Sequence, residues 1–131
     1  MEFAAPRLEL PAHWMPPPSE KLKINVDGAV FTSQKAAGVG ILVRDEGRTI
    51  GACGKKIWTP LGAVEVEAKA VEFGLQFAKD LLIQDFILEG DSLVLINAMK
   101  EVLPPPSVAA IVFTSLSAIH GFRQVEFSHV P

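Results

Sequence analysis

The sequence predicts an α/β domain in which helices pack on one mixed β-sheet. Three segments with strand character occupy the first half of the chain, and helical and strand-like segments alternate in the second half. Hydrophobic residues make up 49% of the 131 residues, which is enough to bury a single core. The expected order is β-β-β-α-β-α-α-β, and this order is typical of a mixed sheet with helices against it.

The first three predicted strands form an antiparallel meander. Residues 22–28 alternate apolar and polar side chains, so Asp27 lies on the polar face and closes this short strand. Residues 38–44 and 48–56 are expected to form a hairpin, because the sequence Asp45-Glu46-Gly47 between them favours a tight turn.

The remaining elements follow from a change in periodicity. Residues 63–82 are rich in Ala, Glu, Lys and Leu and show the spacing of an amphipathic helix. A short strand is expected at 85–89 and a helix from residue 92 to about 101, ending before three consecutive prolines. A further helix at 107–120 and a last strand at 124–130 complete the domain.

The N-terminal segment has a different composition from the rest of the chain. Residues 1–20 contain five prolines and no helical or strand periodicity, so a flexible, extended leader is expected. The alternative is that Trp14 packs back onto the domain. The folded domain is expected to occupy residues 21–131.

Charge, cysteine content and hydropathy indicate how the protein could bind nucleic acid and in which compartment it occurs. Twelve Lys and Arg against fifteen Asp and Glu give a net charge of −3, so nucleic acid would have to be bound through local charge or a metal. The single Cys53 excludes an internal disulfide, and the N-terminus lacks a secretion signal. No apolar run approaches the roughly 18 residues needed to cross a bilayer. A soluble intracellular protein is expected, in the nucleus or the cytoplasm.

Glu67 stands out in the first predicted helix. At 100° per residue, the other polar side chains of the solvated stripe fall within about 40° of Glu65: Lys69, Glu72 and Gln76. Glu67 lies roughly 200° from Glu65 and points toward the sheet. The alternative is a partly solvated first-turn glutamate favoured by the helix dipole.

Asp91 allows two interpretations. It precedes a helix, where either Asp91 or Ser92 could be an N-cap that stabilises the helix by about 1 kcal/mol. It also follows a strand, and ligands gather at the carboxyl ends of parallel strands. If the strands of Asp27 and Asp91 pair in parallel, both carboxylates join Glu67 at one edge. Such a cluster usually binds a divalent cation, which predicts a metal site for phosphodiester chemistry.

Five segments carry a resemblance to a known family. In this order and spacing, the sequence resembles plant ribonuclease H-like domains of the reverse transcriptase-like family, which are related to non-LTR retroelements. The resemblance spans about residues 14–131 and rests on these segments: Ile24–Ala29, Gly38–Asp45, Val66–Leu75, Leu88–Ser92 and Phe127–Pro131.

The resemblance implies a ribonuclease H-like fold with five strands in the order 3-2-1-4-5. It implies hydrolysis of the RNA strand of an RNA–DNA hybrid with Mg²⁺, or with Mn²⁺. Asp27 matches the metal-binding aspartate of the first strand, Glu67 the glutamate of the first helix, and Asp91 the aspartate after the fourth strand. Two ions about 4 Å apart activate a water and stabilise the leaving oxygen in such sites. His129 matches a strand position and not a catalytic base.

The sequence departs from this family after its last strand. Family members continue into a final helix that supplies a fourth metal-binding aspartate, whereas this sequence ends at Pro131. A truncated domain with impaired or lost activity is therefore expected. The alternatives are a non-catalytic nucleic-acid-binding module and a protein-interaction module. The uncovered sheet face predicts an apolar patch, self-association, or coverage by leader residues 3–14.

Overall fold

Five strands and three α-helices make up the computed structural model, which describes residues 22–45, 48–100 and 103–130. The strands are β1 Leu22–Phe31, β2 Ala36–Asp45, β3 Arg48–Ile57, β4 Asp85–Gly90 and β5 Gln124–His129. The α-helices are α1 Ala63–Asp80, α2 Leu93–Met99 and α3 Ala109–Ala118. Short 3₁₀ turns occur at Thr32–Gln34, Pro106–Val108 and Ile119–Gly121. The predicted order of elements is confirmed.

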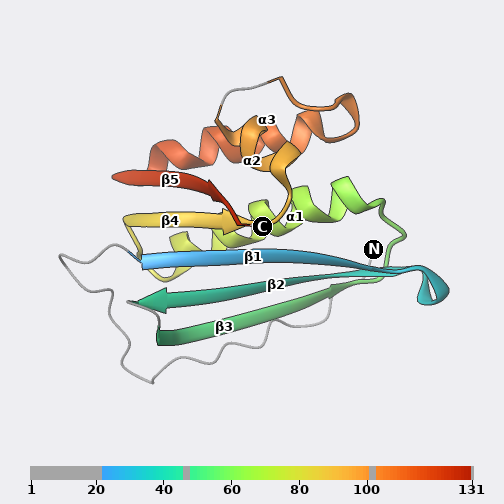
Figure 1. Ribbon diagram of the computed structural model, residues 1–131, viewed down its shortest axis with the longest axis horizontal. Coiled ribbons are helices and arrows are strands. Elements are labelled where there is room, and N and C mark those ends of the chain that lie inside the picture. The colour runs from blue at the N-terminus through green and yellow to red at the C-terminus, as the bar shows by residue number, and fades with distance from the viewer. Residues whose placement is uncertain (1–21, 46–47, 101–102, 131) are drawn as a thin grey trace.

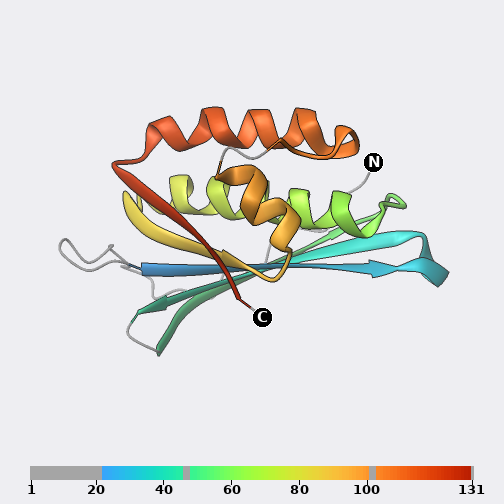
Figure 2. The ribbon, with the colours of Figure 1, turned by 45° about the horizontal axis from the view of Figure 1, so that its top comes forward.

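One mixed sheet carries all the strands, in the order β3-β2-β1-β4-β5 (Figure 1). β1, β2 and β3 form the antiparallel meander, and β4 pairs in parallel with both β1 and β5. Figure 2 shows α1 lying on the sheet and α3 lying outside α1 as a third layer. The sheet order 3-2-1-4-5 is therefore confirmed.

The core lies between the sheet and α1. On β1, the alternation of side chains buries Leu22, Ile24 and Val26 to 4% exposure or less. On α1, the apolar stripe that includes Val71 and Leu75 faces them and is equally buried. The same alternation turns the polar side chains of β1, Asp27 among them, away from this core.

β1 is longer than predicted, and the expectation that Asp27 closes it is wrong. The strand continues to Phe31, and its last residues pair with the start of β2, down to Phe31 opposite Ala36. Gly28 does not begin a turn, because it lies opposite Val39 in the ladder. The chain reverses only at the 3₁₀ turn that follows, where Lys35 adopts a left-handed φ of 51°.

Two helices end earlier than predicted. α1 stops at Asp80 because Leu82 takes a left-handed φ of 61°. The amide of Ile83 then donates to the carbonyl of Ala78, and that of Leu82 to Lys79, which is a Schellman ending formed without glycine. α2 stops at Met99. The predicted leader 1–20 and the turn residues Glu46 and Gly47 lie outside the described residues.

The sheet face opposite α1 is partly apolar and partly charged. Leu42 on β2 is 44% exposed on this face. Beside it the buried carboxylate of Glu89 lies 3.4 Å from the guanidinium of Arg44 and 3.8 Å from the ammonium of Lys23. The ion pairs compensate the burial of Glu89, and they join three adjacent strands.

A close contact between α1 and β1 sets the position of the helix. A Cβ atom at Gly74 would lie 2.5 Å from Cγ1 of Val26, so only glycine permits this approach. We expect Gly74→Ala to destabilise the fold by about 1 kcal/mol, because overpacking of about 1–3 kcal/mol exceeds the gain in helix propensity of about 1 kcal/mol.

The double variant Gly74→Ala/Val26→Ala tests the cause of this effect. Removing the methyl groups of Val26 makes room for the new Cβ, so the two changes are expected to be coupled by roughly 0.5 kcal/mol or more in chemical denaturation. Additive effects would show that the contact between these two side chains does not limit the helix position.

Candidate metal centre

Three carboxylates from three different parts of the fold meet beside the C-terminal end of β4. Asp27 belongs to β1, Glu67 to α1, and Asp91 directly follows β4. One ligand atom from each lies within 4.8 Å of the others. Asp27 and Asp91 are exposed, and Glu67 is half-buried. Oxygen donors at this spacing match the ligands that hard divalent cations prefer, so the cluster could hold a metal ion.

The parallel pairing of β1 and β4 brings the two aspartates together. The last pair is Asn25 opposite Glu89. Asp27 in β1 and Asp91 just after β4 therefore both lie two residues beyond it. The condition on which their predicted proximity depended is therefore met. Because β1 continues past this point while β4 ends, Asp27 is held inside a strand and Asp91 begins a connection to α2.

Glu67 points from α1 toward β1, as its position on the helical wheel predicts. The amide of Gly28 donates to Oε1 of Glu67 at 3.3 Å. A Cβ at Gly28 would lie 3.0 Å from the carbonyl oxygen of Val66, so glycine lets the helix approach the strand here. The role of a solvated first-turn glutamate falls instead to Glu65, whose Oε1 accepts from the amide of Gly62 at 3.1 Å.

Asp91 is not the cap of α2. The N-cap is Ser92, whose Oγ accepts from the amide of Leu95 at 3.5 Å. The carboxylate of Asp91 is thus left to the cluster. Of the two capping residues that the sequence allowed, the structure selects Ser92.

His129 supports Asp91 through the backbone, a role that the sequence did not reveal. Its Nε2 lies 3.1 Å from the carbonyl oxygen of Asp91, to which it donates when it carries the proton. The amide of Val130 donates to the carbonyl of Gly90 at 2.9 Å. Both contacts depend on the parallel pairing of β4 with β5, and they fix the residue that carries the third carboxylate.

Burial and the two neighbouring carboxylates raise the pKa of Glu67 to about 7. Burial is the largest cause, followed by the negative charges of Asp91 and Asp27, while the hydrogen bond from Gly28 acts in the opposite direction. A bound cation would remove the mutual repulsion of the three carboxylates. The donor set, its charge and its spacing therefore all fit a divalent metal.

A pH titration should reveal this coupling. Without metal, the folded-state pKa of Glu67 is above its ordinary value of 4.5, so this group makes the free energy of unfolding fall as pH rises from 4.5 to about 7. A divalent cation binds the deprotonated form, so we expect Mg²⁺ affinity to rise over the same range and Mg²⁺ to lower the pKa.

Carbon-detected NMR of the Glu67 carboxyl group, with and without Mg²⁺, measures both effects. In a Glu67→Gln variant the dependence of Mg²⁺ affinity on pH near 7 should disappear. An unchanged titration of Glu67 at saturating Mg²⁺ would contradict the prediction.

Comparisons with solved structures define the class of fold. Ribonuclease H1 from the halophilic archaeon Halobacterium salinarum superposes with a TM-score of 0.76 at 22% identity, covering 85% of this chain and 86% of that one. The N-terminal ribonuclease H domain of a Mycobacterium tuberculosis protein superposes with a TM-score of 0.74 at 20% identity, covering 86% of this chain and 84% of that one. LC11 ribonuclease H1, solved in complex with an RNA/DNA hybrid, has a TM-score of 0.71 at 20% identity, covering 85% of this chain and 86% of that one. The chain has a ribonuclease H-like fold.

The sequence itself identifies the family. Residues 25–131 match the family described as reverse transcriptase-like, and the chain belongs to it. No curated protein matches the sequence. Within the described residues, no helix has the length and apolar character needed to span a bilayer.

Proposed function

We propose that this domain binds Mg²⁺ at Asp27, Glu67 and Asp91 and cleaves the RNA strand of RNA–DNA hybrids endonucleolytically. The observation that carries the proposal is the meeting of these three carboxylates within 4.8 Å on a ribonuclease H-like fold. Mn²⁺ has the same preference for oxygen ligands and is expected to substitute. The hybrid bound by LC11 ribonuclease H1 supports the choice of substrate.

Each carboxylate has a distinct role in the proposed site. Bound ions would supply an activated water and charge stabilisation for the leaving oxygen. Asp27 is held by its place inside β1. Glu67 is oriented by the amide of Gly28. Asp91 is oriented through its backbone by His129. Together these contacts preorganise the site before metal binds.

The proposed surface for the hybrid lies at the end of the sheet where β1 and β3 finish. The ammonium of Lys56 lies 3.9 Å from the ring centre of Trp58 and 5.8 Å from that of Phe31. Both rings are exposed, at 46% and 40% respectively. We name these three residues the Phe31–Trp58 cluster. Exposed aromatic faces with a cation beside them suit contacts to sugars, bases and phosphates.

We expect Trp58→Ala to weaken hybrid binding by about tenfold, because one aromatic contact of about 1–3 kcal/mol is lost. Fluorescence anisotropy of a labelled hybrid measures this effect. The matched control is Phe113→Ala, which removes a ring that is 56% exposed on α3. Equal affinities of the two variants would exclude the Phe31–Trp58 cluster from the interface.

A second candidate function is hybrid binding without cleavage. The observation that favours it is the size of the cluster, since three carboxylates meet in the part of the chain that the structure describes. Three ligands suffice for one ion and hold a second ion weakly, whereas the two-ion mechanism uses both. A protein-interaction module is the third possibility and needs neither metal nor hybrid.

A cleavage assay distinguishes these functions. A hybrid labelled on its RNA strand is incubated with the protein and Mg²⁺ or Mn²⁺, with an all-DNA duplex and chelator as controls. Metal-dependent cuts confined to the RNA strand are the expected result. Binding without cleavage at high protein concentration would overturn the catalytic proposal in favour of the binding module, and loss of both would overturn the nucleic-acid function.

Ancestry and assembly are part of the same proposal. We infer an origin in plant ribonuclease H domains related to non-LTR retroelements, a reducing intracellular setting, and self-association through the sheet face that carries Leu42. That residue is 44% exposed, which supports an apolar contact. Sedimentation at increasing concentration, compared with Leu42→Lys, tests the assembly, and a wild-type monomer at all concentrations would exclude it.

A further inference from the structure

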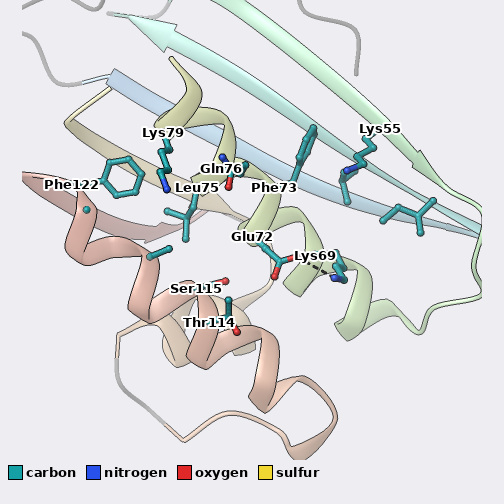
Figure 3. Close-up of a pocket in the computed structure, with 14 residues that line it drawn as sticks. Lys55, Lys69, Glu72, Phe73, Leu75, Gln76, Lys79, Thr114, Ser115 and Phe122 are labelled. Atoms are coloured by element: carbon teal, nitrogen blue, oxygen red, sulfur yellow. Dashed lines mark hydrogen bonds and ion pairs between the residues drawn. The ribbon is translucent and has the colours of Figure 1, made fainter. Parts of the chain in front are cut away.

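A groove separate from the metal centre runs between α1, α3 and β3. It has a volume of about 390 Å³, and its lining includes none of the three clustered carboxylates. Figure 3 shows the apolar side chains of Phe73 and Leu75 from α1 and the ring of Phe122, which begins the connection to β5. The volume lies at the small end of the roughly 300–1,000 Å³ typical of small-molecule sites.

The charges around the groove are unbalanced toward positive. Three lysines and one glutamate line it. Lys69 pairs with that glutamate, Glu72, at 3.1 Å, and Lys55 lies 5.2 Å from the ring centre of Phe73. Lys79 has no ion pair among the described residues, and its side chain points into the groove near Leu75 (Figure 3). A negative group of a ligand would complement this charge.

A buried hydroxyl lies behind the wall of the groove. Ser115 on α3 lines the groove, is 2% exposed, and its Oγ has no hydrogen-bond partner among the described residues. The neighbouring Thr114 differs, because its Oγ1 donates to the carbonyl of Ala110 at 2.9 Å. Unpaired buried hydroxyls are unfavourable and uncommon, so Ser115 is a polar point behind an otherwise apolar wall of the groove.

We propose that this groove binds a small amphiphilic anion, with an apolar body against Leu75 and Phe122 and an acidic group at Lys79. The small volume excludes a long peptide, and the apolar floor excludes a free inorganic anion as the preferred ligand. The site does not depend on the proposed nuclease function, because its residues and its charge are distinct from those of the metal centre.

Sodium decanoate, a ten-carbon carboxylate, is a suitable probe when kept below its micelle concentration. In ¹H–¹⁵N NMR titrations of the full chain, we expect saturable shifts at the amides of Phe73, Lys79 and Ser115. Decanol, which has no charge, should bind about tenfold more weakly. Shifts that grow without saturation, shifts centred on the opposite sheet face, or equal affinity for decanol would each overturn the proposal.

Matched variants locate the anion and the apolar body. Lys79→Gln should weaken decanoate binding by about five- to tenfold, whereas Lys100→Gln, an exposed lysine that does not line the groove, should leave it unchanged. Ala118→Phe places a ring in the groove and should abolish saturable shifts. Its control is Ser117→Phe, an exposed neighbour on the same helix that is not in the lining.

Circular dichroism and melting temperatures verify that each variant is folded. If Ala118→Phe does not fold, the pair Lys79→Gln and Lys100→Gln decides the outcome. Equal effects of those two lysine variants, or unchanged binding by a folded Ala118→Phe, would overturn the assignment.

Discussion

Replacing Asp27 by asparagine is expected to abolish hybrid cleavage and to weaken Mg²⁺ binding by roughly a hundredfold or more. Asparagine keeps the size of aspartate and one oxygen that can coordinate a metal, but it removes the charge. Asp27 lies inside β1 and is one of the three carboxylates of the cluster, so its loss leaves two charges to hold the ion. Losing this charge also removes one of the causes that raise the pKa of Glu67.

Isothermal titration with Mg²⁺, together with the cleavage assay, measures this effect. The matched control is Asp80→Asn, the same substitution at an exposed position at the far end of α1. Melting temperatures provide a second measurement, because Mg²⁺ should stabilise the wild type by mass action but not Asp27→Asn. Wild-type affinity in the Asp27 variant would remove this carboxylate from the metal site.

Truncating Phe86 to alanine is expected to cost about 3–5 kcal/mol of the free energy of unfolding. Phe86 is fully buried on β4, and its ring meets that of Phe122 edge-on with centroids 5.0 Å apart. β4 is flanked by β1 and β5, so the cavity would lie in the core between the sheet and Phe122. For a domain whose total stability is about 5–15 kcal/mol, this loss approaches unfolding.

Urea denaturation of Phe86→Ala and Phe113→Ala makes the comparison direct. Both variants lose the same ring, but Phe113 is 56% exposed, so its removal should change stability by less than about 0.5 kcal/mol. Similar losses in the two variants would show that burial in this core does not determine stability.

The elements that carry the three carboxylates could be predicted because each follows from a short-range pattern. The orientation of Glu67 follows from 100° per residue along α1, and the position of Asp91 follows from a strand that ends just before a helix. The three-stranded meander followed in the same way from alternation. Local periodicity therefore sufficed for the order of elements and for the orientation of Glu67. The sheet order, with β1 beside β4, was implied by the family resemblance.

Features that depend on tertiary contacts could not be predicted in this way. β1 was expected to end near Asp27, because nothing in Gly28 alone distinguishes a turn from a residue paired with Val39. The contact of His129 with the backbone of Asp91 exists only because β4 and β5 lie side by side. In the sequence, Ser115 is an ordinary residue of a predicted helix. Only the structure shows that its hydroxyl is buried without a hydrogen-bond partner among the described residues.

The parallel pair of β1 and β4 has a consequence for how the chain folds. β1, β2 and β3 follow one another directly, so their hairpins can form with little loss of chain entropy. β1 and β4 are neighbours in the sheet but are separated in the sequence by two strands and α1. Their pairing is therefore a non-local and slow step. We therefore expect the carboxylates of Asp27 and Asp91 to approach each other after the hairpins have formed, and their repulsion to oppose that step. A divalent cation present during folding should accelerate it.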